Sequence, residues 1–113
     1  MSVDPATGNL ALIVRTDKHY ELGHLENPAG RATYRTLAIS PAEVDQPSWS
    51  PSGHTVSYRQ AAPEGRTMMV RTLRAGVPRP LCSLKEGDET LWLDEHTVAV
   101  VRWDRIAREE VPE

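Results

Sequence analysis

Similar short segments recur along this chain of 113 residues at nearly equal distances. Gly8 and Gly53, 45 residues apart, each precede a run of strand-forming residues. Trp49 and Trp92, 43 residues apart, each stand shortly before a turn and a further such run. Two equivalent turns lie 46 residues apart: Ala29-Gly30 and Ala75-Gly76. This spacing indicates that one supersecondary unit is used more than once.

The fullest copy of the repeated unit is the stretch 47–58, which reads Pro-Ser-Trp-Ser-Pro-Ser-Gly-His-Thr-Val-Ser-Tyr. Pro51 presets φ for a tight turn, and Gly53 can adopt the left-handed conformation that closes it. The β-branched and aromatic residues that follow favour a central antiparallel strand. Trp49 stands before the turn as an apolar anchor, so we expect its side chain to be mostly buried.

This stretch resembles the repeat of TolB-type β-propellers, which typically reads Pro-x-Trp-Ser-Pro-Asp-Gly before an apolar strand. Ser52 stands where that family has aspartate, and the other positions match: Pro47, Trp49, Ser50, Pro51 and Gly53. The period of 43 to 46 residues also agrees with the roughly 40 to 50 residues of a four-stranded propeller blade. The resemblance implies an all-β fold of antiparallel, propeller-like blades. The alternative is a small β-sandwich with propeller-like hairpins.

The length fits one β domain over residues 1–113, made of repeats at about 1–46 and 47–90 and a partial repeat at 91–113. That is material for about two and a half blades, whereas propellers usually close with four to eight. The outer faces of the terminal blades would then be bare. Three explanations are open: a fragment of a longer propeller, a ring completed by association, or a small sandwich.

The pattern of apolar and β-branched residues predicts strands at 10–14, 19–25, 33–39, 55–58, 67–73, 77–84 and 97–103. The nearly continuous apolar run 10–14 predicts a strand that is covered on both faces. Two prolines place the segment 77–84 at the edge of a sheet. We expect at most a capped helical turn at 40–43, and a helical turn or a frayed end at 104–113.

The charge pattern gives no sign of a nucleic-acid or membrane partner. The net charge is −3, which would not draw the protein to nucleic acid or to an anionic membrane. Four arginines in a stretch without acids (Arg66, Arg71, Arg74, Arg79) precede an acidic segment at 86–95. We interpret the two segments as solvated faces of adjacent strands and loops; the alternative is complementary patches for self-association.

The sequence lacks a membrane-spanning run and a secretory signal. No stretch approaches the roughly 20 apolar residues of a membrane span. The first residues lack the basic region and apolar core of a signal peptide, so we expect a cytoplasmic protein. Cys82 is the only cysteine, which excludes an internal disulfide, and its apolar neighbours favour a buried, inert thiol.

The residues that carry catalysis in known motifs are missing or badly spaced. There is no glycine-rich phosphate loop and no Gly-x-Ser-x-Gly elbow. His19 and His24, five residues apart, would lie on opposite faces of a strand, which is poor geometry for a metal site. The acids of the segment 94–96 lie beside His96, but no serine or cysteine nucleophile can be assigned to them, which favours a turn.

The three tryptophans, Trp49, Trp92 and Trp103, could stack on bases or sugars in an exposed groove. Two of them occupy equivalent positions of the repeat, which favours anchors in the core. Met68 and Met69 alternate across a strand, so we expect one in the core and the other partly exposed.

From these observations and the resemblance we expect a non-enzymatic protein-interaction or scaffold domain of TolB-like propeller type. The alternative is an accessory propeller segment of a prolyl-oligopeptidase-like peptidase, inactive alone because the chain carries no catalytic domain. We expect no catalytic residues, no cofactor and no metal. The expected partner is another protein or a second copy of the chain, and neither nucleic acid nor membrane.

Overall fold

The structure, a computed structural model, describes residues 1–74 and 76–112. Within these residues the chain forms eleven strands and no helix. The strands are β1 (Ser2–Val3), β2 (Leu10–Arg15), β3 (Tyr20–Glu26), β4 (Thr33–Ser40), β5 (Val44–Trp49), β6 (Thr55–Ala62), β7 (Gly65–Thr72), β8 (Arg79–Leu84), β9 (Glu89–Asp94), β10 (Thr97–Val101) and β11 (Ile106–Glu110). Each pairing in the described chain is antiparallel, which confirms the predicted all-β antiparallel fold class.

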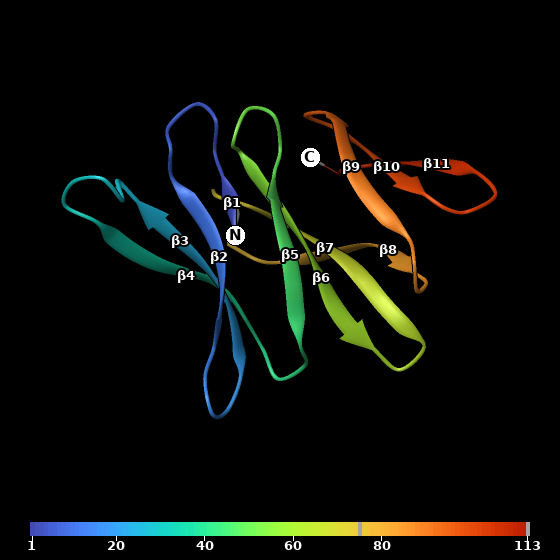
Figure 1. Cartoon of the computed structure of the whole chain (residues 1–113), viewed down its shortest axis with the longest axis horizontal. Helices are drawn as coiled ribbons and strands as arrows, with labels where there is room; N and C mark the ends of the chain where they lie inside the picture. Colours follow the sequence, from blue (N-terminus) through green and yellow to red (C-terminus); the bar gives the residue numbers. More distant parts are fainter. Residues whose placement is uncertain (75, 113) are drawn as a thin grey trace.

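The strands form three sheets in which neighbours along the chain are also neighbours in space. The first sheet has the order β1-β2-β3-β4, the second β5-β6-β7-β8, and the third β9-β10-β11. Short turns connect the strands, as expected for meanders with local pairing. Figure 1 shows the sheets one after another along the longest axis, from the blue and teal first sheet to the orange and red third sheet. None of the three closes into a barrel within the described chain.

The sheets begin slightly earlier than the repeats that the sequence predicts. The first sheet ends at Ser40 and the second begins at Val44, whereas the predicted boundary lies between residues 46 and 47. The second sheet ends at Leu84 and the third begins at Glu89, whereas the predicted boundary lies between 90 and 91. The strands with Trp49 and Trp92 therefore open a sheet.

Two apolar cores lie between the sheets. The first core joins the first and second sheets through the buried side chains Ala11, Leu22, Leu37, Val44, Trp49, Val56 and Tyr58. The second core joins the second and third sheets through Met68, Val70, Leu84, Val98, Val100 and Val111. The second sheet is thus covered on both faces, because alternate residues of a strand point to opposite sides.

Polar contacts from the tryptophans and one arginine tie neighbouring sheets together. Trp49 Nε1 donates a hydrogen bond to the carbonyl oxygen of Ser2 at 3.1 Å. Trp92 Nε1 donates to Ser57 Oγ at 3.1 Å. The buried Arg71 donates through Nε to the carbonyl oxygen of Leu37 at 3.0 Å. Trp49 and Trp92 lie on the first strands of the second and third sheets, and the side chain of each faces the preceding sheet.

The first and second sheets repeat the same backbone geometry with an offset of 46 residues. Val3 pairs with Leu10 in the first sheet, and Trp49 pairs with Val56 in the second. The turn that follows is closed in both sheets by a hydrogen bond between residues five apart. These bonds run from Asp4 N to Asn9 O and from Ser50 N to Thr55 O, both at 2.8 Å. Val3 is therefore the structural counterpart of Trp49.

The central turn and its tryptophan agree with the sequence-based predictions. Trp49 is 6% exposed and belongs to the first core, which confirms that its side chain is mostly buried. Gly53 has φ of +77°, as the predicted left-handed position requires. The strand that follows, β6, is paired on both sides, with β5 and with β7, and is therefore central. Met68 is buried and Met69 is partly exposed, also as predicted.

Three expectations about local structure are wrong. Residues 40–43 form no helical turn: Ser40 ends β4, its hydroxyl accepts a hydrogen bond from Ala42 N at 3.1 Å, and β5 follows directly. The segment 104–113 contains the strand β11, because β10 has a second edge whose backbone groups need partners. The strand β2 is covered on one face alone, where Ala11 and Ile13 pack into the first core.

The predicted edge position of the segment 77–84 is confirmed, since β8 is the last strand of the second sheet. The predicted equivalence of the turns 29–30 and 75–76 cannot be followed fully, because Ala75 lies outside the described residues. Gly76 has φ of +77°, whereas Gly30 does not have a positive φ.

Candidate interaction surfaces

The turns between the first and second strands of the three sheets lie beside one another along one edge of the stack (Figure 1). Asp4, in the first of these turns, accepts hydrogen bonds from Ala6 N at 3.0 Å and Thr7 Oγ1 at 2.8 Å. Gly53, in the second turn, lies against the same carboxylate. A Cβ atom at Gly53 would come within 2.4 Å of Asp4 Oδ2, so the contact requires glycine.

Glu95 connects the third turn to the second. Its carboxylate accepts hydrogen bonds from Ser50 Oγ at 2.6 Å and from the backbone nitrogen of Ser52 at 2.8 Å. Burial raises the pKa of Glu95, but the hydrogen bonds from Ser50 and Ser52 outweigh it, so the pKa lies below its usual value of 4.5. The carboxylates of Asp4 and Glu95 therefore both serve as hydrogen-bond acceptors at this edge, and Glu95 joins the third turn to the second.

An open groove of about 730 Å³ runs along β5, and its lining includes Met1, Tyr20 and Thr90. The acids of this region are paired. Asp45 receives both Nε and Nη2 of Arg59, at 2.9 and 2.8 Å, and Glu43 accepts a hydrogen bond from Arg66 at 2.7 Å. Because these charges are already compensated within the second sheet, the groove presents little net charge to a ligand.

The outer face of the first sheet is largely apolar. Register partners point to the same side of a sheet, so the residues of one row can be assigned to one face. The face that points away from the second sheet is named the first end face, and its apolar residues are Val3, Leu10, Leu12, Val14, Leu25, Tyr34 and Ile39. Val3 is 54% exposed and Ile39 is 63% exposed. No element of the described chain packs over this face.

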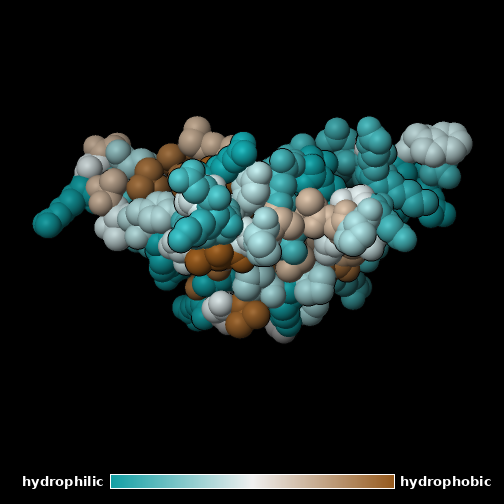
Figure 2. Space-filling model, turned by 90° about the horizontal axis from the view of Figure 1, so that it is seen from below, coloured by the Kyte–Doolittle hydropathy of each residue, from teal (hydrophilic) through white to brown (hydrophobic). Residues whose placement is uncertain are grey.

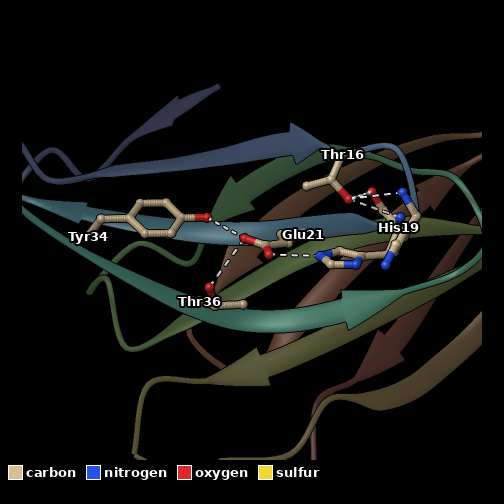
Figure 3. A network of polar contacts seen from close by, with 6 residues as sticks. Thr16, His19, Glu21, Tyr34 and Thr36 are labelled. Carbon is tan, nitrogen blue, oxygen red and sulfur yellow. Dashed lines mark hydrogen bonds and ion pairs between the residues drawn. The ribbon is translucent and has the colours of Figure 1, made fainter.

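A polar network is set into the first end face around Glu21 (Figure 3). Glu21 Oε2 accepts hydrogen bonds from Tyr34 Oη at 2.9 Å and Thr36 Oγ1 at 3.2 Å, and Oε1 accepts one from His19 Nε2 at 2.9 Å. These donors, led by His19, lower the pKa of Glu21 below its usual value. The Tyr34 ring lies directly over Gly23, where any side chain would collide with it.

The outer face of the third sheet has an apolar centre. Val98 and Val100 point into the second core, so the alternating residues of β10 and their register partners face away from the second sheet. These residues define the second end face. Its apolar members are Ala99, Val101, Leu91 and Ile106, joined by Leu93, which alternates with Trp92 on β9, and its polar members are Thr97, Glu89, Asp94, Arg108 and Glu110. Leu91 is 60% exposed and Ile106 is 66% exposed.

The exposed apolar side chains are concentrated on the two end faces. Ten large apolar side chains are exposed among the described residues, and seven belong to these faces. The other three are Met1, Val77 and Trp103. Figure 2, in which the first sheet is again on the left, shows brown apolar side chains mainly over that half of the molecule. Such a distribution marks a surface for association, because single exposed apolar residues are normally scattered.

The histidines that the sequence analysis considered lie apart. His24 is buried against Trp49, with ring centroids 5.3 Å apart in an edge arrangement. Burial lowers the pKa of His24 and outweighs the opposite effect of Glu26, whose Oε1 lies 3.5 Å from His24 Nδ1, and neither ring nitrogen makes a hydrogen bond. His19 bonds to Glu21 on the opposite face of the first sheet. The described part of the chain contains no group of three or more potential metal ligands.

Most of the charged side chains in the two charged segments are exposed or half-buried, as the predicted solvated faces require, but two are buried. Arg71 is buried in the first core region, and Asp88 is buried beside Arg102 Nε at 3.2 Å. Asp94 accepts a hydrogen bond from His96 N at 2.8 Å within the turn between β9 and β10. Cys82 is partly buried on the edge strand β8, and burial raises the pKa of its thiol to about 11.

The sequence predicts bare outer faces on the terminal blades, but it did not identify the residues that form them. One signal was available: Asp4-Pro5 and Ser50-Pro51 are also 46 residues apart, which would have aligned Val3 with Trp49. That alignment places an exposed residue where the second sheet has a buried tryptophan. The repeat would then have shown that Val3 belongs to a face of the first sheet that no preceding sheet covers.

Comparison of the sequence with models of known protein families gave no match, and comparison with curated proteins gave none either. No helix in the described chain has the length and apolar character needed to cross a membrane.

Proposed function

We propose that this chain is a non-enzymatic protein-interaction module built from propeller-type blades, and that its two end faces are the binding surfaces. The observation that carries the proposal is the contrast between covered and uncovered faces. Sheets meet through buried apolar cores inside the stack, whereas both end faces leave large apolar side chains exposed. Natural proteins normally cover surfaces of this kind with a partner.

The order of the strands supports the propeller-type reading. Each sheet is a meander, and the sheets pack face to face in the order of the sequence. The turn after Trp49 carries the residues Ser50, Pro51 and Gly53 of the TolB-like repeat, and Gly53 has the left-handed conformation that the repeat implies. In propellers such blades stack around an axis and present surfaces for other proteins.

The state of the titratable groups supports a non-enzymatic role. A general acid at neutral pH needs a raised pKa, whereas the carboxyl groups of Glu21, Asp94 and Glu95 have lowered pKa values. Burial raises the pKa of Tyr58 to about 12. The carboxylates of Glu21, Asp94 and Glu95 each accept hydrogen bonds within the fold and so have structural roles.

The proposal can be tested by making both end faces polar. The double variant Val3→Glu/Leu91→Glu changes one exposed side chain on each end face, so the fold itself should be preserved. The matched control, Val77→Glu/Trp103→Glu, changes two side chains that are at least as exposed but lie off the end faces. We expect wild type and control to associate in sedimentation velocity at micromolar concentration, and the end-face variant to be a monomer.

The contrary outcome is equally clear. A wild-type protein that sediments as a soluble monomer of 12.6 kDa, indistinguishable from both variants, would rule out the end faces as binding surfaces.

A further inference from the structure

We infer that the partner of the end faces is a second copy of this chain, joined head to tail so that the second end face of each copy packs on the first end face of the other. This inference rests on the proposed function and specifies its partner. The two copies form a closed ring of six sheets. Three features of the molecule support this arrangement: the equivalence of the faces, the number of sheets, and the area of the contact.

The two end faces are the unused counterparts of faces that already pack together inside the chain. Trp49, on the first strand of the second sheet, points toward the first sheet. Its counterpart Trp92, on the first strand of the third sheet, points toward the second sheet. Its counterpart in the first sheet is Val3, which points outward from the first end face. The first end face is therefore of the type that receives a preceding sheet.

The second end face is of the opposite type. His24, on the third strand of the first sheet, contacts Trp49 of the next sheet. Val70, its counterpart in the second sheet, lies in the core against which Trp92 packs. The counterpart in the third sheet is Arg108, which pairs with Ala99 and points outward. The second end face thus has the register to receive a following sheet, with Arg108 over Val3 of the second copy.

The number of sheets favours two copies. The chain supplies three sheets, so two copies supply six and three copies supply nine. Sheet rings of this type usually contain four to eight units. A ring of two copies has six sheets and falls within this range, whereas a ring of three copies has nine and does not. A two-fold axis relates the copies, and a head-to-tail contact that closes on itself leaves no end face bare.

The area is also adequate. A sheet of three or four strands about 4.8 Å apart and about 20 Å long presents a face of roughly 300–400 Å², and β2 has the six residues that this length requires. Four end faces are buried in the ring, which amounts to roughly 1,200–1,600 Å². This is the size of a standard stable interface.

The charged residues of the two faces are compatible with this pairing. Glu21 is the one charged side chain that points outward from the described strands of the first sheet, and its three hydrogen-bond donors lie within that sheet. The second end face carries Arg108 and three acids, Glu89, Asp94 and Glu110. The acids stand at the ends of β9 and β11, and Arg108 lies on the edge strand β11, so the charges surround an apolar centre, as in stable interfaces.

The experiment uses complementary variants of the full chain. Val3→Lys alters the first end face, and Arg108→Glu alters the second; both positions are exposed, so each variant is expected to fold. In a head-to-tail dimer of Val3→Lys, the new lysine faces Arg108 in both contacts. In a head-to-tail dimer of Arg108→Glu, the new carboxylate lies beside Glu110 without a partner in both contacts, and in each case association should weaken by at least about 100-fold. Light scattering should give twice 12.6 kDa for wild type and 12.6 kDa for each variant alone.

Mixing the two variants distinguishes the head-to-tail arrangement from other dimers. One contact of the mixed dimer is then wild type on both sides, and the other pairs the new lysine with the new glutamate. An equimolar mixture should therefore recover twice the monomer mass, and labelled subunits should report a dimer with one copy of each variant. Val77→Lys, which lies off both faces, is the control and should remain a dimer.

The results that overturn the inference differ from those that overturn the proposed function. A wild-type mass other than twice that of the monomer, a mixture that stays monomeric, or an Arg108→Glu variant that remains dimeric excludes the head-to-tail pair. If the double variant Val3→Glu/Leu91→Glu still reduces association, the end faces remain binding surfaces, but the partner is arranged differently or is another protein. A monomeric wild-type protein excludes both. Circular dichroism of each variant checks that the fold is retained.

Discussion

Replacement of Trp49 by alanine tests the packing of the first and second sheets. An aromatic side chain of this size buries about 200 Å², and at about 25 cal/mol per Å² this corresponds to roughly 5 kcal/mol as an upper value. Trp49 is 6% exposed, so nearly all of that burial is present in the folded state. Measured losses for such substitutions are about 3–5 kcal/mol.

Two contacts place Trp49→Ala toward the upper end of that range. The edge contact with His24, at 5.3 Å between ring centroids, adds about 0.5–1.5 kcal/mol beyond burial. Loss of the Nε1 hydrogen bond leaves the carbonyl oxygen of Ser2 without this donor, at about 1 kcal/mol. We therefore expect a loss of about 4–5 kcal/mol in the free energy of unfolding, measured by urea denaturation with circular dichroism.

Two further variants make the measurement decisive. Trp49→Phe keeps most of the apolar area and loses the hydrogen bond, so it should cost about 1–2 kcal/mol and remain measurable if the alanine variant is unfolded. Trp103→Ala removes a side chain that is 98% exposed and should change stability by less than about 0.5 kcal/mol. A loss below about 1 kcal/mol for Trp49→Ala, similar to that of Trp103→Ala, would contradict the role of Trp49 in the core.

Three other predictions concern the turns and the buried histidine. Gly53→Ala should destabilise the protein by at least about 1 kcal/mol more than Gly8→Ala in the same urea assay, because both glycines have φ of +77° but a Cβ at Gly53 alone meets the Asp4 carboxylate; equal losses would argue against that contact. Burial lowers the folded-state pKa of His24 below 6.5, so the unfolded state binds the proton first, and stability should fall as the pH drops below about 6.5. His24→Gln should flatten the dependence of the free energy of unfolding on pH below about 6.5. An unchanged dependence would show that burial does not lower the pKa of His24. The lowered pKa of Glu95 contributes stability above pH 4.5 that is lost as the pH falls through the folded-state pKa. Glu95→Gln should reduce that acid sensitivity, and a profile like that of wild type would mean that the bonds to Ser50 and Ser52 do not hold the turn.

Local patterns predict seven of the eleven strands of the described chain, because these strands depend on side-chain alternation and turn chemistry; β1, β5, β9 and β11 were not predicted. The turn at Pro51 and Gly53, the buried Trp49 and the edge strand with its two prolines all follow from rules that act over a few residues. The strand β11 was missed for the opposite reason. Its sequence is Ile-Ala-Arg-Glu-Glu, which has little β propensity, and it is a strand because β10 offers an edge.

The candidate surfaces were harder to predict because they depend on how sheets stack. The run 10–14 is apolar on both sides, and the sequence alone indicates burial of both. The fold assigns Ala11 to a core and Leu12 to an end face, a distinction that requires knowing which sheet neighbours it. Similarly, the arginine and acid segments are dispersed by the fold, so that Arg71 is buried whereas Arg66 pairs with Glu43.

The mass of the wild-type protein in solution, measured by light scattering across a dilution series at micromolar concentration, tests the central claim most directly. The stack has two complementary apolar ends, so we expect twice 12.6 kDa at high concentration, with a shift toward 12.6 kDa on dilution. A mass of 12.6 kDa at every concentration, from a soluble protein that unfolds cooperatively, would contradict the claim and would favour a self-contained β-sandwich.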